Sequence, residues 1–176
     1  MNILGKTISM VMLLVMFNSQ AADLEAAQVS VEWVEPENFT DILAGDQLKS
    51  RYQQQLFKGF EKYFNKLARR LPTDYQWHIK VTDIDLAGDV NHGYSAGLRR
   101  IRVLGSFFKI KVAFSYQVMD AQGAVVVQGD EVLKENMIEK FPRTVMRLGS
   151  HSYEQYLVKR WFDKVLLAKL NDATAL

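Results

Sequence analysis

The sequence predicts an α+β fold, a two-layer α/β sandwich with two helices on one face of a sheet of about five mostly antiparallel strands. Several short segments alternate apolar and polar residues, which is typical of strands with one buried and one wet face. Two longer segments repeat apolar residues every three or four positions, as amphipathic helices do. These segments follow the order β-α-β-β-β-β-α, and two helices suffice to cover the buried face.

Alternating patterns predict strands at residues 29–33, 75–84, 99–103, 108–120 and 124–133. The first ends near Pro36, and the strand–helix–strand start predicts one parallel pairing. The turn DAQG at residues 120–123 indicates a hairpin. A glycine inside a strand pattern often marks a bulge, so we expect one at Gly129.

The first helix is predicted over residues 46–71, with Asp46 as its N-cap and Pro72 ending it. The last helix is predicted over residues 152–170, where Ser152 and Gln155 have the spacing of a capping box. This last helix has two apolar rows. With the second row, the apolar side of this helix is wider than contact with one sheet needs. We expect the second row to be buried rather than to bind a partner. Its members are Val158, Phe162 and Leu166.

The N-terminal residues 1–21 have the pattern of a cleaved Sec-type secretory signal peptide. Lys6 forms a short basic region and residues 8–17 are almost entirely apolar. Ser19 and Ala21 are small residues before the expected cleavage point after Ala21, and cleavage after Ala22 is the close alternative. Bilayer spanning needs roughly 20 apolar residues, so this run is too short for an anchor. We therefore expect a periplasmic protein whose single globular domain is residues 22–176, with no integral membrane segment after cleavage.

The composition of the mature chain excludes several classes of protein. Residues 22–176 number 176 − 21 = 155 and contain 21 basic and 20 acidic side chains, so the net charge is +1. This balance gives no electrostatic footprint for nucleic acid. The chain has no cysteine, so neither a disulfide nor a lipid on an N-terminal Cys is available, and stability must come from a packed core.

The stretch VTDIDLAGDVNHG, residues 81–93, gathers acids around a glycine. Asp83, Asp85, Asp89 and His92 could together hold a metal ion. A calcium loop of the EF-hand type lacks two ligands here, and strands flank the stretch instead of helices. Asp and Gly also favour a turn after a strand, where Asp side chains accept hydrogen bonds from backbone N–H groups. We favour the capped turn.

Residues 93–97, GYSAG, match the nucleophile-elbow pattern of serine hydrolases. That motif needs a helix after the serine, whereas an alternating strand pattern follows here, so we interpret the segment as a hairpin loop. No P-loop, dinucleotide-binding or zinc-type pattern is present, and we expect no cofactor.

The polar face of the predicted sheet is rich in bases. The alternation that buries Trp77 and Ile79 exposes basic or titratable side chains on three strands, which would form one positive face if the strands were neighbours. Such a face would bind an anionic envelope ligand or an acidic protein, and it lacks the interleaved aromatics that stack nucleic acid bases. The residues are His78, Lys80, Arg100, Arg102, Lys109 and Lys111.

Several stretches along the chain resemble the domain of unknown function 3016 family. They are VEWVEPENFTDI, ARRLP, VTDIDLAGD, RIRV, FSYQVMDAQGAVVVQGDEVLKEN and KRWFDKVL, and they cover nearly all of the mature chain. The resemblance implies a small exported protein of Gram-negative proteobacteria with a periplasmic destination, and it implies no particular activity.

The sequence therefore favours a non-enzymatic accessory or binding module of the cell envelope. The alternative is a small metal-assisted hydrolase, in which a metal held by the acidic stretch would lower the pKa of a bound water.

Overall fold

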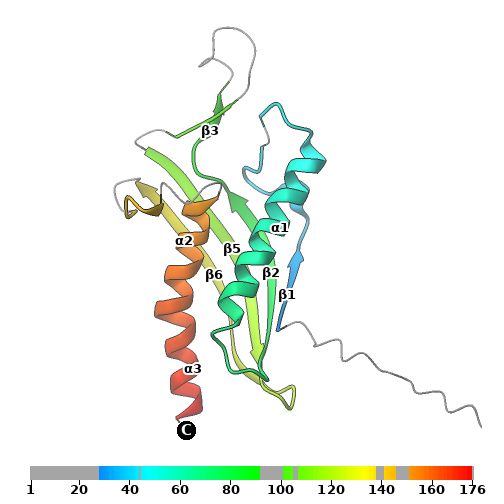
Figure 1. Cartoon of the computed structure of the whole chain (residues 1–176), viewed down its shortest axis with the longest axis vertical. Helices are drawn as coiled ribbons and strands as arrows, with labels where there is room; N and C mark the ends of the chain where they lie inside the picture. The colour runs from blue at the N-terminus through cyan, green and yellow to red at the C-terminus, as the bar shows by residue number, and fades with distance from the viewer. Residues whose placement is uncertain are drawn as a thin grey trace, which may run out of the picture.

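The computed structural model describes residues 28–43, 45–91, 101–104, 107–137, 141–145 and 151–175. The main sheet has four strands in the order β1-β2-β5-β6. Their bounds are Val29–Trp33, Gln76–Asp85, Phe107–Met119 and Val125–Met137. β1 pairs with β2 in parallel, and the other neighbours are antiparallel. Helices lie on one face of this sheet (Figure 1), so the predicted α+β sandwich is confirmed.

The predicted third strand does not join the main sheet. β4 (Ile101–Val103) pairs only with β3 (Asp89–Asn91) in a separate two-stranded sheet. The chain leaves β2 through Gly88, whose φ of 80° favours glycine, and a Cβ there would lie 2.4 Å from the Val103 carbonyl oxygen. Alternation predicts which side of a strand is buried but not which strand it pairs with, so no pattern in the sequence separates this hairpin from the main sheet.

Helix α1 (Lys49–Ala68) packs its apolar row on the sheet. Leu56, Phe60 and Phe64 are buried in this row. The predicted cap at Asp46 is wrong. Leu48 occupies the N-cap position, two residues after Asp46, and its apolar side chain makes no capping hydrogen bond.

The C-terminal helical stretch has three parts. α2 (Ser152–Trp161) is followed by a π-helical turn (Phe162–Leu166) and then by α3 (Leu167–Thr174). The predicted capping box is wrong, since Ser152 is already the first helical residue and His151 precedes it with a left-handed φ of 62°. The predicted second row of Val158, Phe162 and Leu166 is buried. The first row is buried as far as Trp161, whereas Val165 is half-buried and Ala168 is exposed.

Trp77 of β2 joins the two layers. It is fully buried, and its ring meets Phe64 of α1 at a centroid distance of 5.6 Å. Phe162 and Trp161 approach the same ring at 5.4 and 6.3 Å. One side chain of the sheet therefore contacts both helical segments.

Gly129 does not form the predicted bulge. It pairs regularly with Tyr116 across β5 and β6, while the register shifts lie elsewhere. The Tyr116 ring occupies the space that a side chain at Gly129 would take, with its Cε1 atom 3.3 Å from the position of a Cβ. The Tyr116 hydroxyl also bonds Lys169 Nζ at 3.1 Å. The glycine is thus required by the partner residue and not by backbone conformation.

Gly129→Val should lower the free energy of unfolding by roughly 1–3 kcal/mol, because overpacking displaces the Tyr116 ring. Gly59→Ala is the matched control. Gly59 lies inside α1, and no atom lies within 4 Å of the position that a Cβ would take there, so alanine should stabilise by about 0.5–1 kcal/mol. Urea unfolding measures both, and an unchanged Gly129→Val variant would contradict the close approach.

Candidate functional site

The acidic stretch lies at the end of β2, and its first carboxylate is already bound. Asp83 accepts hydrogen bonds from the Thr40 backbone N–H at 2.7 Å and the Thr40 hydroxyl at 2.8 Å, and it pairs with Lys111. Burial raises the pKa of Asp83, but the hydrogen bonds from Lys111 and Thr40 outweigh it and leave the pKa below its ordinary value. Asp83 thus fixes the segment after β1 to β2 and β5.

Asp85 lies near the Asp83–Lys111 pair, whereas Asp89 lies on β3. The pKa of Asp85 is raised by burial and by the charge of Asp41, partly offset by Lys111. Asp89 begins β3, opposite Val103 of β4. His92 and the GYSAG segment lie outside the described residues. Within the described ranges, no group of three or more His, Cys, Asp or Glu side chains is placed to hold a metal ion.

Arg102 holds the β3–β4 hairpin against the end of the sheet. Its guanidinium donates to both oxygens of Asp41, at 2.8 and 3.0 Å. It also donates to the carbonyls of Gly88 at 3.0 Å and Leu43 at 3.1 Å. Because its side chain is only 20% exposed, this is a structural clamp and not a free surface charge. Arg100, the neighbouring base of the predicted face, lies outside the described residues.

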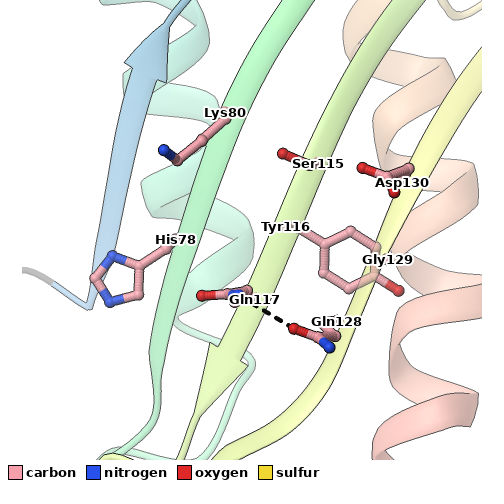
Figure 2. Close-up of a pocket in the computed structure, with 8 residues that line it drawn as sticks. All are labelled: His78, Lys80, Ser115, Tyr116, Gln117, Gln128, Gly129 and Asp130. Carbon is pink, nitrogen blue, oxygen red and sulfur yellow. Dashed lines mark hydrogen bonds between the residues drawn. The ribbon is translucent and has the colours of Figure 1, made fainter.

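The open face of the main sheet carries a shallow hollow of about 660 Å³ (Figure 2). His78 and Lys80 enter it from β2, and polar side chains of β5 and β6 complete it. Gln117 bonds Gln128 across the hollow at 3.1 Å. The His78 Nδ1 atom lies 2.6 Å from Ser30 Oγ, while its Nε2 atom is buried and has no partner. The hollow is polar, with few apolar walls.

The charges on this open face cancel. Lys80 pairs with Glu32 at 3.1 Å, and Lys111 pairs with Asp83. The face carries four bases and four acids, so its net charge is 4 − 4 = 0. The bases are Lys80, Lys109, Lys111 and Lys134, and the acids are Glu32, Asp83, Asp85 and Asp130. The predicted positive face therefore does not have the charge that its bases alone suggested.

A different surface concentrates positive charge. Five bases follow one side of α1 within about 80° of arc, at the roughly 100° per residue of an α-helix. They are Arg51, Lys58, Lys62, Lys66 and Arg69, which we call the α1 cationic stripe. All five are exposed, and none forms an ion pair with an acid of the described ranges. The stripe lies opposite the buried row of α1.

A groove of about 370 Å³ runs beside the α1 cationic stripe. Lys62, Lys66 and Arg69 line it together with Tyr63 and with Gln155 of α2. The only acid of α1 is Glu61, and its carboxylate accepts a bond from Trp33 Nε1 at 3.1 Å on the β1 side. The stripe was not among the predicted sites, although its spacing of 7, 4, 4 and 3 residues is visible in the sequence. The prediction for this helix used its apolar row, which has the same period but identifies only the side that is buried.

Asp83 and Asp85 should respond oppositely to removal of their charge. Asp83→Asn should lower the free energy of unfolding at pH 7 by about 1–3 kcal/mol, the worth of hydrogen bonds to a charged group. The lowered pKa means that this contribution is complete above the unfolded-state value of about 3.9 and disappears as pH falls through the folded-state value.

Asp85→Asn is the matched control. The raised pKa of Asp85 means that its ionised form opposes folding, so the amide should leave stability at pH 7 unchanged or increased. Urea unfolding from pH 3 to pH 8 measures both variants. Equal losses in both would show that the Lys111 and Thr40 contacts do not distinguish the two carboxylates.

Known proteins resemble this chain at the level of family and only distantly in structure. No curated protein matches the chain at a significant level. The crystal structure of a "putative lipoprotein" from Caulobacter crescentus CB15 is 11% identical, with a TM-score of 0.37 over 86% of this chain and 93% of that one. No helix in the described ranges is both long and apolar enough to cross a membrane. Residues 27–164 match the family described as "Protein of unknown function (DUF3016)". The match covers most of the sequence, and the chain belongs to the DUF3016 family.

Proposed function

We propose that this chain is an exported, non-enzymatic binding module of the cell envelope that docks on anionic envelope components through the α1 cationic stripe. The observation that carries this proposal is the uncompensated charge of the stripe. Five exposed bases share one side of a helix whose single acid is turned toward Trp33. A protein with a mature net charge near +1 must concentrate charge locally to attract a polyanion.

The geometry of the stripe suits a flat anionic surface. Arg51 and Arg69 are about 27 Å apart along the helix at 1.5 Å per residue, and the side of α1 that carries them faces away from the sheet. Each base near an anionic lipid surface contributes about 1 kcal/mol, so five give weak and salt-sensitive binding. The groove beside Lys62, Lys66 and Arg69 would hold individual phosphate groups.

The open sheet face supports this proposal less well. Two of its lysines are paired with acids, so a polyanion would have to displace Glu32 from Lys80 and Asp83 from Lys111. The polar hollow around His78 suits a partner that offers hydrogen bonds, such as a protein surface.

Export is expected from the signal-like pattern of residues 1–21. The chain produced in a Gram-negative host should be released by osmotic shock, with Ala22 as its first residue in mass spectrometry. Replacing Leu13 and Leu14 by Arg should leave full-length protein in the cytoplasm, because the apolar segment would no longer engage the export machinery. Gln122→Arg in the β5–β6 hairpin should still be exported. Full-length wild-type chain in the cytoplasm would contradict the proposal.

Vesicle co-sedimentation of residues 22–176 tests the stripe. We expect binding to vesicles rich in phosphatidylglycerol at low salt, little binding in 0.5 M salt, and none to phosphatidylcholine vesicles. The variant with Lys58, Lys62 and Lys66 replaced by Gln should lose at least tenfold in affinity. The matched control replaces Lys80, Lys109 and Lys134 of the sheet face by Gln, which removes the same charge.

The two triple variants separate the surfaces. Retained binding in the sheet variant and lost binding in the α1 variant supports the proposal. The reverse result would show that the vesicles bind to the sheet face and not to the α1 cationic stripe. Absence of binding to anionic vesicles in the wild-type chain would overturn the proposal for both surfaces.

A further inference from the structure

A small cavity lies at the end of the sheet where the first turns of α1 and α2 meet the β3–β4 hairpin. Its volume is about 260 Å³, enough for about eight water-sized groups at roughly 30 Å³ each. The side chains that decide its chemistry are Tyr52, Arg102, Leu104, His151, Tyr153 and Glu154. It is separate from the α1 cationic stripe and from the hollow on the sheet.

Glu154 is the only acid among the described residues that line this cavity. It is 1% exposed, and its Oε1 atom accepts a hydrogen bond from the Ala87 backbone N–H at 2.6 Å. No other residue that the structure describes donates a hydrogen bond to its buried Oε2 atom. A buried carboxyl oxygen without a donor is costly, so each such atom requires an explanation. A donor supplied by a ligand would satisfy it.

The neighbouring cation does not neutralise Glu154. Both terminal nitrogens of Arg102 already donate hydrogen bonds to Asp41, and one also donates to the backbone carbonyl of Gly88. Its Nε atom is the second polar atom at this site that is buried without a partner. Burial and the charge of Arg102 lower the pKa of His151 to about 4, so this imidazole is neutral at pH 7. Arg102 and Asp41 cancel, and the ionised Glu154 would leave a charge of −1.

The walls of the cavity also favour a cation. Tyr52 and His151 pack edge to face at a centroid distance of 5.9 Å, and Tyr153 lies beside Glu154 in α2. Aromatic rings next to a carboxylate are a typical environment for organic ammonium groups. Leu104 is 45% exposed and adds an apolar surface to the lining.

We propose that this cavity binds a small organic ammonium ion with Glu154 as its counter-ion. The ammonium group donates to Glu154 Oε2, an oxygen atom next to it in the ligand accepts from Arg102 Nε, and the apolar part lies against Leu104. The ligand class is therefore a small amino alcohol or a compound with the same pair of groups.

Three isosteric probes test the proposal on residues 22–176 by NMR titration. They are 2-amino-1-butanol, 1,2-butanediol, in which a hydroxyl replaces the ammonium, and 3-aminopentane, in which a methyl replaces the hydroxyl. The Ala87 amide, which bonds Glu154, is the reporter. We expect saturable shifts with 2-amino-1-butanol and at least tenfold weaker binding of 1,2-butanediol. We also expect 3-aminopentane to bind more weakly than 2-amino-1-butanol, because it lacks the oxygen that would accept from Arg102.

Glu154→Gln should remove the preference for the amine while the fold persists, because the amide oxygen can still accept from Ala87. Glu131→Gln is the matched control. Glu131 lies on β6, where it accepts a hydrogen bond from Lys169 of α3, and it is outside the cavity. A measurement without any variant is the pH dependence. Burial raises the pKa of Glu154, so affinity for the amine should rise with pH as Glu154 ionises, whereas affinity for the diol should not.

Equal affinities for the amine and the diol, or amine binding that survives Glu154→Gln, would overturn the proposal. Equal binding of 3-aminopentane and 2-amino-1-butanol would overturn the part assigned to Arg102. Neither result depends on whether the α1 cationic stripe binds anionic vesicles.

Discussion

The packing of Trp77 is the contact on which the rest of the domain depends. Its ring is fully buried between α1 and the C-terminal helical stretch, so both helices are positioned by one residue of β2. A chain without disulfides has to obtain such rigidity from aromatic contacts. The indole Nε1 atoms of Trp77 and Trp161 are buried without partners, which shows that ring packing outweighs two lost hydrogen bonds here.

The sequence predicted those parts of the fold that depend on local periodicity. The strands at 29–33 and 75–84, the DAQG turn and the buried second row of the last helix all follow from patterns within one segment. Asp120 illustrates why, because its side chain accepts bonds at 2.9 Å from Gln122 and Ala124 within the turn itself. Two errors are local, at the helix starts predicted for Asp46 and Ser152. The other errors concern contacts between distant segments. Gly129 is required by Tyr116 of another strand, and the strand containing Arg102 pairs outside the main sheet.

The candidate sites show the same limit. Lys80 and Lys109 of the sheet face are exposed, while Lys111 is half-buried. The acids near Lys80 and Lys111 become their neighbours only after the strands pair. The α1 cationic stripe could have been found from spacing alone, since one helix carries all five bases. The Glu154 cavity could not, because Tyr52, Arg102 and Glu154 are about fifty residues apart in sequence and meet only in the folded chain.

The π-helical turn at Phe162–Leu166 contains one residue more than an α-helical turn, because the backbone N–H of Leu167 bonds the carbonyl of Phe162. The wider turn absorbs this extra residue, so α2 and α3 keep the facing that a continuous α-helix one residue shorter would give them. Loss of one residue inside the turn would therefore leave Lys169 beside Tyr116 and Leu170 in the core. The same loss in a regular α-helix, such as α1, would rotate the residues beyond it by about 100°. A single deletion should therefore be tolerated inside this turn, as in the β5–β6 hairpin, but not in the middle of α1.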